Sequence, residues 1–390
     1  MINRDRLAET FKSLVKTDSV SRNEAGFSDE LRNILESMGA ETVVDKAGEK
    51  VGGDTGNLIA KFKGNTQARP LLLNAHLDTV EPGRGVVPVC KDGVFASDGK
   101  TILGADDKSA IAILLEALRV IQENNLPHSP LELLFTVCEE IGLLGAKHLD
   151  YSLITATYGY ALDASDTEGI VTRAPGCNRL EFKVHGRDAH AGAAPEKGIN
   201  AIFLACKAVA NIEIGRIDHE TTCNIGIIEG GIARNVVPNM VTVKGEARSH
   251  DEEKLDKVTS EIVFSFKEVI QNYHAVARPA SGDEAGADSD DGLPRVDIQV
   301  ERDFPRTHIP DDHSVVKLAQ KAAANLGRKM VIKTSGGGAD ANIFFEKGIV
   351  TGVLGTGMRD MHTVRESVRL DDMVRATELV LEIIKLHSGE

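Results

Sequence analysis

The feature that most constrains the fold is an alternation of apolar runs with helical patterns between residues 70 and 170. Residues 71–75 and 131–138 are typical of buried strands, and the apolar spacing in residues 107–122 predicts a helix between them. A further strand is predicted at residues 158–162. Strands separated by helices form a mostly parallel sheet, which binds ligands at the carboxyl ends of its strands. We therefore expect functional residues at those ends.

The pattern changes after residue 173, where alternation with a period of two is typical of antiparallel strands. The predicted strands are residues 179–184, 223–228 and 236–247, and the predicted helices are residues 199–212 and 252–273. The earlier pattern resumes with a helix at 314–326, a strand at 349–354 and a helix at 371–386. We predict an α/β protein with a mostly parallel-sheet catalytic domain, residues 1–174 and 307–390, and an inserted α+β lid or dimerisation domain, residues 175–306.

Charge and cysteine content exclude some classes of protein and suggest a compartment. Asp and Glu number 59 against 45 Lys and Arg, a formal net charge of -14 that argues against binding to nucleic acid. The five cysteines form no C-x-x-C pair and suit reduced, mostly buried thiols. Residues 1–15 are typical of an amphipathic helix, so we expect neither a signal peptide nor a membrane span. A cytoplasmic protein is predicted.

The segment 279–294 (PASGDEAGADSDDGLP) is acidic and rich in Gly and Ser, which predicts a mobile loop. It lacks the spacing of an EF-hand, so no calcium site is predicted there.

Side chains able to bind metal follow several of the predicted strands. His76 and Asp78 end the first strand and point to the same side of an extended chain, where the carboxylate is placed to orient the imidazole. So short a motif also occurs by chance, and a solvated strand end is the simpler interpretation. Asp163 directly follows the predicted strand at 158–162, and His362 follows the strand at 349–354. A lone histidine in such a place is more often structural.

Two pairs of adjacent acids stand at element boundaries. Asp106 and Asp107 stand at the start of the predicted helix, where capping explains one of them and leaves the other able to bind cations. Glu139 and Glu140 follow the second strand, and adjacent like charges are costly unless a cation or water offsets them. In two-metal hydrolysis, one such acid is a ligand and its neighbour takes a proton from water. An exposed pair in a loop is the alternative.

Taken in order, these motifs resemble a known family. His76-x-Asp78, Gly104-Ala105-Asp106-Asp107-Lys108, Glu139-Glu140, Asp163 and His362 are similar to the ordered motifs of the di-zinc peptidases that include peptidase T, carboxypeptidase G and the aminoacylases. The resemblance extends from residue 71 to residue 367, and the ordered set is far more specific than any one motif.

The resemblance implies a role for each residue. Asp106 would bridge two divalent metal ions, with His76 and Asp163 on one and Glu140 and His362 on the other. Glu139 would be the general base, and Asp78 would orient His76. The metal would be zinc, with cobalt or manganese as alternatives, because all three accept mixed nitrogen and oxygen ligands.

Further segments match the family's substrate-binding parts. Residues 186–192 resemble a lid segment whose histidine, His190 here, stabilises the oxyanion, in dimeric members across the subunit interface. A homodimer is therefore expected. Asn235 and Arg248 would bind the carboxylate or backbone of a short peptide. Gly337 and Gly338 belong to a loop that lines the family's pocket, where glycine allows close approach to a ligand.

The motifs leave the substrate open. Residues 105–108, 127–128 and 146–148 look most like peptidase T, but Gly336 stands where tripeptidases carry an arginine. We expect a metal-dependent exopeptidase that hydrolyses short peptides, as a tripeptidase or aminopeptidase does. An N-acyl amino acid deacylase with the same metal chemistry is the alternative. A metal-dependent peptide-binding protein without catalysis is a third interpretation, which the presence of Glu139 disfavours; a structural protein with surface acid clusters would bind no metal tightly.

Overall fold

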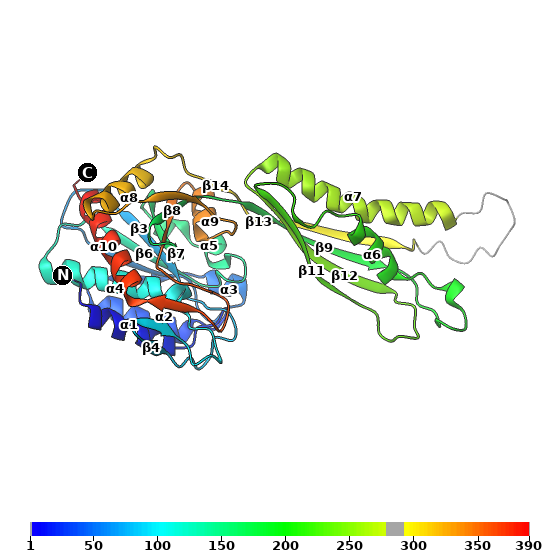
Figure 1. Ribbon diagram of the computed structural model, residues 1–390, viewed down its shortest axis with the longest axis horizontal. Coiled ribbons are helices and arrows are strands. Elements are labelled where there is room, and N and C mark those ends of the chain that lie inside the picture. Colours follow the sequence, from blue (N-terminus) through cyan, green and yellow to red (C-terminus); the bar gives the residue numbers. More distant parts are fainter. Residues whose placement is uncertain (1, 278–291, 390) are drawn as a thin grey trace. The chain divides into compact units, whose positions relative to one another are not determined.

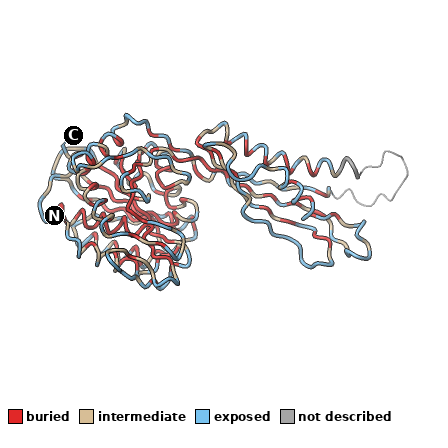
Figure 2. Tube along the Cα trace, in the orientation of Figure 1, coloured by how far each residue is buried: buried red, intermediate tan, exposed pale blue. Residues whose placement is uncertain are grey.

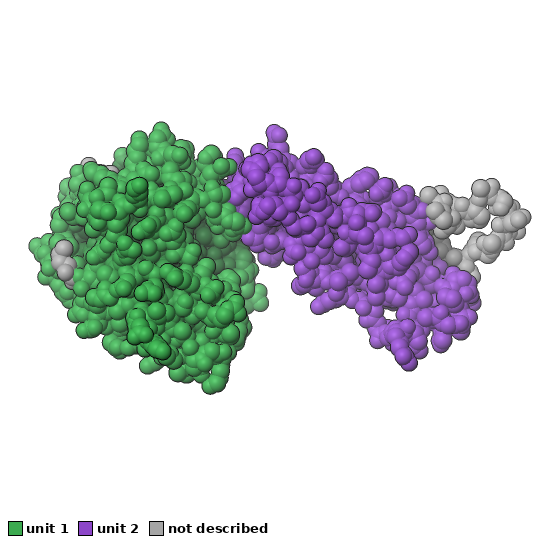
Figure 3. Space-filling model, in the orientation of Figure 1, with its two compact units in different colours: residues 1–174, 307–390 green, residues 175–306 purple. Residues whose placement is uncertain are grey.

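The computed structural model describes residues 2–277 and 292–389, so most of the predicted loop at 279–294 lies outside the described residues. The chain divides into two compact units, Met1–Ala174 with Thr307–Glu390, and Pro175–Arg306 (Figure 3). Each unit has a hydrophobic core of its own, which Figure 2 shows as buried stretches of chain within each.

The first unit is built on one large sheet with the strand order β1-β2-β6-β3-β7-β16-β8-β14, and β15 also pairs with β8. Its strands are β1 (Glu41–Val44), β2 (Leu58–Phe62), β3 (Leu71–His76), β6 (Leu131–Thr136), β7 (Tyr158–Ala164), β8 (Gly169–Ala174), β14 (Thr307–His308), β15 (Val331–Thr334) and β16 (Val350–Gly355). The four central strands β6, β3, β7 and β16 run parallel to one another. Strands β2 and β8 flank them in the antiparallel sense. The prediction of an α/β fold with a mostly parallel sheet is confirmed.

Helices cover both faces of this sheet (Figure 1). They are α1 (Arg4–Lys16), α2 (Ala25–Ser37), α3 (Ala47–Val51), α4 (Ala105–Asn124), α5 (Leu144–His148), α8 (Ser314–Asn325), α9 (Asp340–Glu346) and α10 (Leu370–His387). A Cβ on Gly352 would meet Val315 of α8, whereas the next residue, Val353, packs with Ala341 of α9. Because neighbouring residues of a strand face opposite sides, α8 and α9 lie on opposite faces of the sheet.

The central elements are buried on every side, which explains their sequences. All six residues of β3 are buried, as expected for a strand covered on both faces. Helix α4 is buried along nearly its whole length between β3 and the helices α1 and α10. Residues 110–115 (AIAILL) make the middle of the helix apolar all round, and such a segment needs an enclosed place. A small antiparallel sheet of β4 (Val89–Lys91), β5 (Val94–Ala96) and β17 (Ser367–Arg369) completes this unit.

The second unit is an antiparallel sheet with two helices on one face. The strand order is β10-β11-β12-β9-β13. The elements are β9 (Gly176–His185), α6 (Ala201–Ala210), β10 (Gly215–Arg216), β11 (Thr221–Gly230), β12 (Met240–Ser249), α7 (Glu252–Ala277) and β13 (Arg295–Phe304). Phe182 of β9 stacks on Phe266 of α7 with 3.9 Å between ring centroids. Alternate residues of β9 are buried, so one face of the sheet meets the helices and the other carries charged side chains.

The predicted strand at residues 236–247 starts four residues too early. Strand β12 begins at Met240, because Pro238 has no backbone N–H to give to a sheet. Residues 236–239 instead form a loop, in which the N–H of Val237 donates to the carbonyl of Ala189 at 2.9 Å. The carbonyl of Pro238 accepts from the N–H of Ala201 at 2.9 Å.

The inserted unit leaves and re-enters the large sheet at one point. Strand β14 pairs with β8 in the antiparallel sense, and Thr307 lies opposite Ala174. The residues on either side of the insertion are therefore direct neighbours in the sheet.

Membrane spans and the state of the cysteines were also predicted from the sequence. Within residues 2–277 and 292–389, no helix is both long enough and apolar enough to cross a membrane. All five cysteines have free thiols; Cys138, Cys177 and Cys223 are buried, and Cys90 and Cys206 are exposed.

Candidate metal centre and active site

Three side chains meet around Asp106, at the carboxyl ends of the parallel strands. Its Oδ1 lies 2.9 Å from Nε2 of His76, and its Oδ2 lies 3.3 Å from Nε2 of His362. Nε2 of His362 is also 2.9 Å from Oε2 of Glu140. Asp106 therefore presents one oxygen to each histidine, which is the orientation needed by a carboxylate shared between two cations.

Asp163 joins this group through His76. Ligand atoms of His76, Asp106 and Glu140 lie within 4.8 Å of one another, and so do those of His76, Asp107 and Asp163. His76 ends β3 and Asp163 is the penultimate residue of β7. All five residues predicted to bind metal thus lie in one cluster.

Asp106 and Asp107 lie in the first turn of α4, where their backbone departs from helical geometry, and neither side chain caps the helix, so the prediction that capping explains one of them is wrong. Gly104 is the N-cap residue, and no side chain accepts a capping hydrogen bond there. Oδ2 of Asp107 accepts from the backbone N–H of His76 at 3.2 Å, and its Oδ1 is buried without a hydrogen-bond partner. Both carboxylates turn toward His76 instead of toward the helix.

Asp78 supports the cluster in a different way from that predicted. Nδ1 of His76 donates to the backbone carbonyl of Asp78 at 2.8 Å, while the carboxylate is 3.6 Å away. The carboxylate instead accepts from the backbone N–H groups of Glu139 at 2.8 Å and Glu140 at 3.2 Å. The hydroxyl of Ser21 also donates to it at 2.6 Å. Asp78 therefore orients His76 through its carbonyl and the two glutamates through its side chain.

Glu366 is a supporting residue that the sequence reasoning missed. Its Oε2 accepts from the N–H groups of Leu103 at 2.8 Å and Gly104 at 2.7 Å, and its Oε1 accepts from the N–H of Asp106 at 2.9 Å. One buried carboxylate thus fixes the loop that presents Asp106. No local pattern marks this role, because the partners lie some 260 residues earlier in the chain; only the position of Glu366 four residues after His362 was available as a signal.

The hydrogen bonds of His76 leave an acceptor facing an acceptor. Because Nδ1 donates to a carbonyl, Nε2 of the neutral ring carries a lone pair, and this lone pair faces Oδ1 of Asp106. A proton or a cation must lie between them. Burial disfavours the charged ring, but hydrogen bonds to Asp106 and Asp78 hold the pKa of His76 well above its ordinary value.

The pKa values of other side chains in the cluster are also far from their ordinary values. Burial, reinforced by the charge of Asp163, raises the pKa of Glu139 well above its usual range. Burial and the charge of Asp106 do the same to the pKa of Asp163. Hydrogen bonds to Asp106 and Glu140 raise the pKa of His362 to about 10. So many buried acids need extra protons to coexist, and divalent cations would replace those protons. The residues therefore fit a pair of divalent cations.

Three predicted lid residues lie in the second unit, where two of them meet. The N–H of Ala191 donates to the carbonyl of Asn235 at 3.0 Å, so Asn235 lies beside His190. Nδ1 of His190 accepts from the N–H groups of Gly192 at 3.2 Å and Ala193 at 3.1 Å. The proton of the neutral ring is therefore on Nε2, which is left as a donor.

Arg248 lies at the other end of the same sheet. His185 pairs with Met240 at the end that adjoins the His190 loop, whereas Cys177 pairs with Arg248. Eight residues along β12 correspond to roughly 25 Å at the rise of an extended strand. Both Nε and Nη2 of Arg248 donate to the carboxylate of Glu246, at 2.8 and 3.1 Å. The structure thus separates Arg248 from His190 and Asn235.

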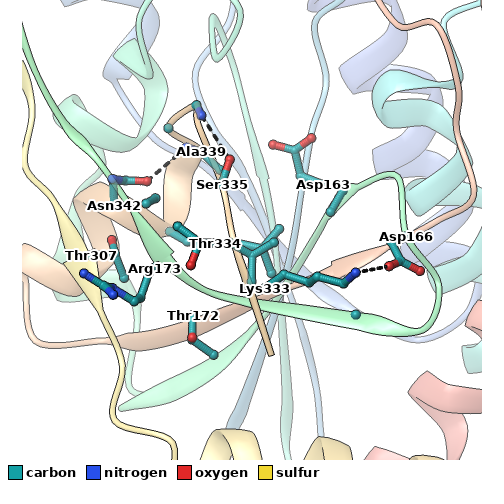
Figure 4. Close-up of a pocket in the computed structure, with 18 of the residues that line it drawn as sticks. Asp163, Asp166, Thr172, Arg173, Thr307, Lys333, Thr334, Ser335, Ala339 and Asn342 are labelled. Carbon is teal, nitrogen blue, oxygen red and sulfur yellow. Dashed lines mark hydrogen bonds and ion pairs between the residues drawn. The ribbon is translucent and has the colours of Figure 1, made fainter. Parts of the chain in front are cut away.

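A cavity of about 330 Å³ lies next to the cluster in the first unit (Figure 4). Asp163 and Met361, the neighbour of His362, border it, and so do Gly337 and Gly338. Its volume is at the low end of the range for small-molecule sites.

Fold and cluster together define the class: the protein is a peptide-bond hydrolase of the α/β type. A family model describes the particular group. The chain belongs to Peptidase family M20/M25/M40, whose model matches residues 72–386.

Similar proteins cover the whole chain. The chain is 40% identical over 386 residues to an uncharacterized protein of Bacillus subtilis strain 168, YqjE, covering 99% of each. Among solved structures, it is similar to a tripeptidase of Staphylococcus aureus (TM-score 0.89, 36% identity, 100% of both chains). It is also similar to the aminopeptidase PepT of Bacillus cereus (TM-score 0.86, 37% identity, 100% of both chains). The predicted resemblance to peptidase T-like members of this family is confirmed.

Proposed function

We propose that the protein is an exopeptidase that hydrolyses short peptides with two divalent metal ions, most suitably zinc. The orientation of Asp106, one oxygen toward His76 and the other toward His362, is the observation that carries this proposal. His76 and Asp163 would hold one ion, Glu140 and His362 the other, and Asp106 both. Imidazole nitrogen with carboxylate oxygen is a donor set that zinc accepts, and cobalt and manganese accept it as well.

The cations, when bound, supply Lewis-acid polarisation of the substrate carbonyl and acidify water. The protein's own part is proton transfer. Glu139 takes a proton from the attacking water and gives it to the leaving amine. Its position supports this role, because Asp78 fixes its backbone and because burial, together with the charge of Asp163, raises the pKa of its side chain.

We further propose that His190 stabilises the oxyanion and that Asn235 and Arg248 bind the peptide backbone or carboxylate. The Nε2–H of His190 is a suitable donor. A tripeptide spans about 10 Å, which is much less than the separation of His190 from Arg248 along the sheet of one inserted unit. One copy of the unit therefore cannot place both residues on the same substrate. A homodimer in which a second copy supplies His190 and Asn235 resolves this separation.

The inserted unit carries a surface suited to that dimer. Beyond Cys223, no strand of the described chain pairs with the outer edge of β11, and an open strand edge is a template for another strand. Ile227 and Ile228 on this edge are 46% and 49% exposed, and Phe203 on α6 is 55% exposed. A second copy of the same edge, related by two-fold symmetry, is the partner we propose.

Metal analysis followed by assays on one preparation tests the proposed function. We expect near two metal ions per chain and cleavage of tripeptides or dipeptides by the loaded protein. Two ions with hydrolysis of N-acyl amino acids alone would identify a deacylase instead. Absence of bound metal after dialysis in metal-replete buffer would contradict the proposal as a whole.

A further inference from the structure

We propose that the cavity beside the cluster is a subsite for an acidic side chain, so that the enzyme prefers peptides with glutamate or aspartate next to the bond it cleaves. This inference rests on the proposed peptidase function and names its substrate class. It comes from the two ends of the cavity, which differ in chemistry (Figure 4).

One end of the cavity belongs to the reaction centre. Asp163, a proposed metal ligand, lies at this end, and a substrate carbonyl placed for attack must lie nearby. Asp166 and Lys333 lie on the same side and form an ion pair of 3.1 Å, so their charges offset each other. This pair therefore adds little net charge to this end of the cavity.

The other end gathers hydrogen-bond donors. Figure 4 shows Arg173, Thr307 and Asn342 grouped there, from β8, β14 and α9. The amide oxygen of Asn342 accepts from the N–H of Ala339 at 3.1 Å, so the NH₂ group of this side chain is directed away from that N–H. The guanidinium of Arg173 has only donors. The chemistry of this end therefore suits an oxygen acceptor, and its positive charge suits a carboxylate.

An unused hydroxyl supports a ligand at this end. Oγ1 of Thr307 is buried, has no hydrogen-bond partner, and belongs to a residue that is only 5% exposed. A buried polar group without a partner is costly, and a bound carboxylate would accept its hydrogen. Val171, Ala341 and Val353 also line the cavity and offer apolar surface to the methylene groups of a glutamate.

The charge of the side chain, not only its polarity, is what this subsite should distinguish. The test uses trialanine in which the first or second residue is replaced by glutamate, glutamine, leucine or lysine. At one of the two positions, we expect kcat/KM for glutamate to exceed that for glutamine by about tenfold, the size of a charge-assisted hydrogen bond. Leucine and lysine should be poorer than glutamate.

Two variants assign the preference to named side chains. In Arg173→Gln, the ratio of kcat/KM for glutamate over glutamine should fall close to one. Thr307→Val keeps the shape but removes the hydroxyl, and should reduce kcat/KM for glutamate about fivefold relative to leucine. The control is Arg32→Gln on α2, which removes a guanidinium that pairs with Asp29 on the surface and should keep the wild-type ratio.

Equal cleavage of glutamate and glutamine peptides by the wild type, or an unchanged ratio in Arg173→Gln, would overturn the inference. If the metal-loaded protein cleaves no peptide, the proposed function fails instead. The subsite is then tested by calorimetry, in which the glutamate peptide must bind wild type more tightly than the glutamine peptide does.

Discussion

Oε1 of Glu366 accepts the backbone N–H of Asp106 at 2.9 Å, so a carboxylate near the end of the chain fixes the residue around which the proposed metal site is built. Because Oε2 also binds the N–H groups of Leu103 and Gly104, the whole loop depends on one side chain. We expect Glu366→Ala to weaken metal binding about 10- to 100-fold, as loss of a supporting hydrogen bond does at metal sites. Calorimetric metal titration measures this. Glu366→Gln, which keeps one acceptor, should lie between Ala and wild type; equal affinity in all three proteins would contradict this role.

Removal of the proposed base should separate chemistry from metal binding. Glu139→Gln keeps the size of the side chain but cannot take up a proton, so kcat should fall by about 10²- to 10⁴-fold. The metal content should stay near wild type, because Glu139 is not among the proposed ligands. Stopped assays measure kcat, and metal analysis of the same sample measures the metal content. Retained turnover would exclude Glu139 as the base.

Asp78 offers a test of how the two glutamates are positioned. In Asp78→Asn, an NH₂ group would face the backbone N–H of Glu139 or Glu140, so one hydrogen bond becomes a repulsion. We expect kcat to fall about 10- to 100-fold. Ser21→Ala is the matched control, since it removes a single hydrogen bond to the same carboxylate and should have a smaller effect. Similar losses in both variants would argue that Asp78 acts only through Ser21.

Chelation should lower stability as well as activity. The cluster holds several buried acids whose mutual repulsion cations would relieve, so metal binding should stabilise the folded first unit. Free metal at a hundredfold excess over its dissociation constant contributes about 2.7 kcal/mol. The midpoint of thermal unfolding should therefore drop after treatment with a chelator and recover when zinc, cobalt or manganese is restored. An unchanged midpoint in protein shown to have lost its metal would contradict this.

The open edge of β11 predicts the assembly state. Ile228→Glu or Phe203→Glu places a charge on the exposed apolar surface, which should convert a dimer to a monomer in light scattering after gel filtration. Phe264→Glu on α7 is the control, since Phe264 is 61% exposed but lies on another helix. A wild-type monomer at all concentrations would rule out the proposed dimer and leave His190 without its role in a second copy.

The sequence predicted much of the fold because its buried strands and helices are distinctive. The strand that ends at His76 and the helix α4 have apolar patterns that leave few alternatives, and their observed bounds differ from prediction by at most two residues. Interactions over long distances in the chain were not predictable. Nothing near Glu366 indicates that it binds the N–H of Asp106, and alternation along the strand suggested that the carboxylate of Asp78, not its carbonyl, would hold His76.

The predicted start of β12 and the predicted capping role of Asp107 were wrong because both rested on local sequence patterns. Apolar residues around Val237 continue the pattern of the strand, but Pro238 diverts them into a loop that binds Ala189. An acid before a helix is usually a cap, whereas here the chain needs Asp107 to accept from His76. In both places, a tertiary contact overrides the local preference.

The pairing of Ala174 with Thr307 makes the whole inserted unit equivalent to the turn of a β-hairpin. Changes of length or composition within that turn leave every hydrogen bond of the large sheet in place. The strands that carry His76 and Asp163 near their carboxyl ends keep their register whatever the insert becomes. The metal chemistry proposed for the first unit and the substrate contacts proposed for the second are thus free to diverge separately, which is a route by which one proposed metal cluster could serve many different substrates.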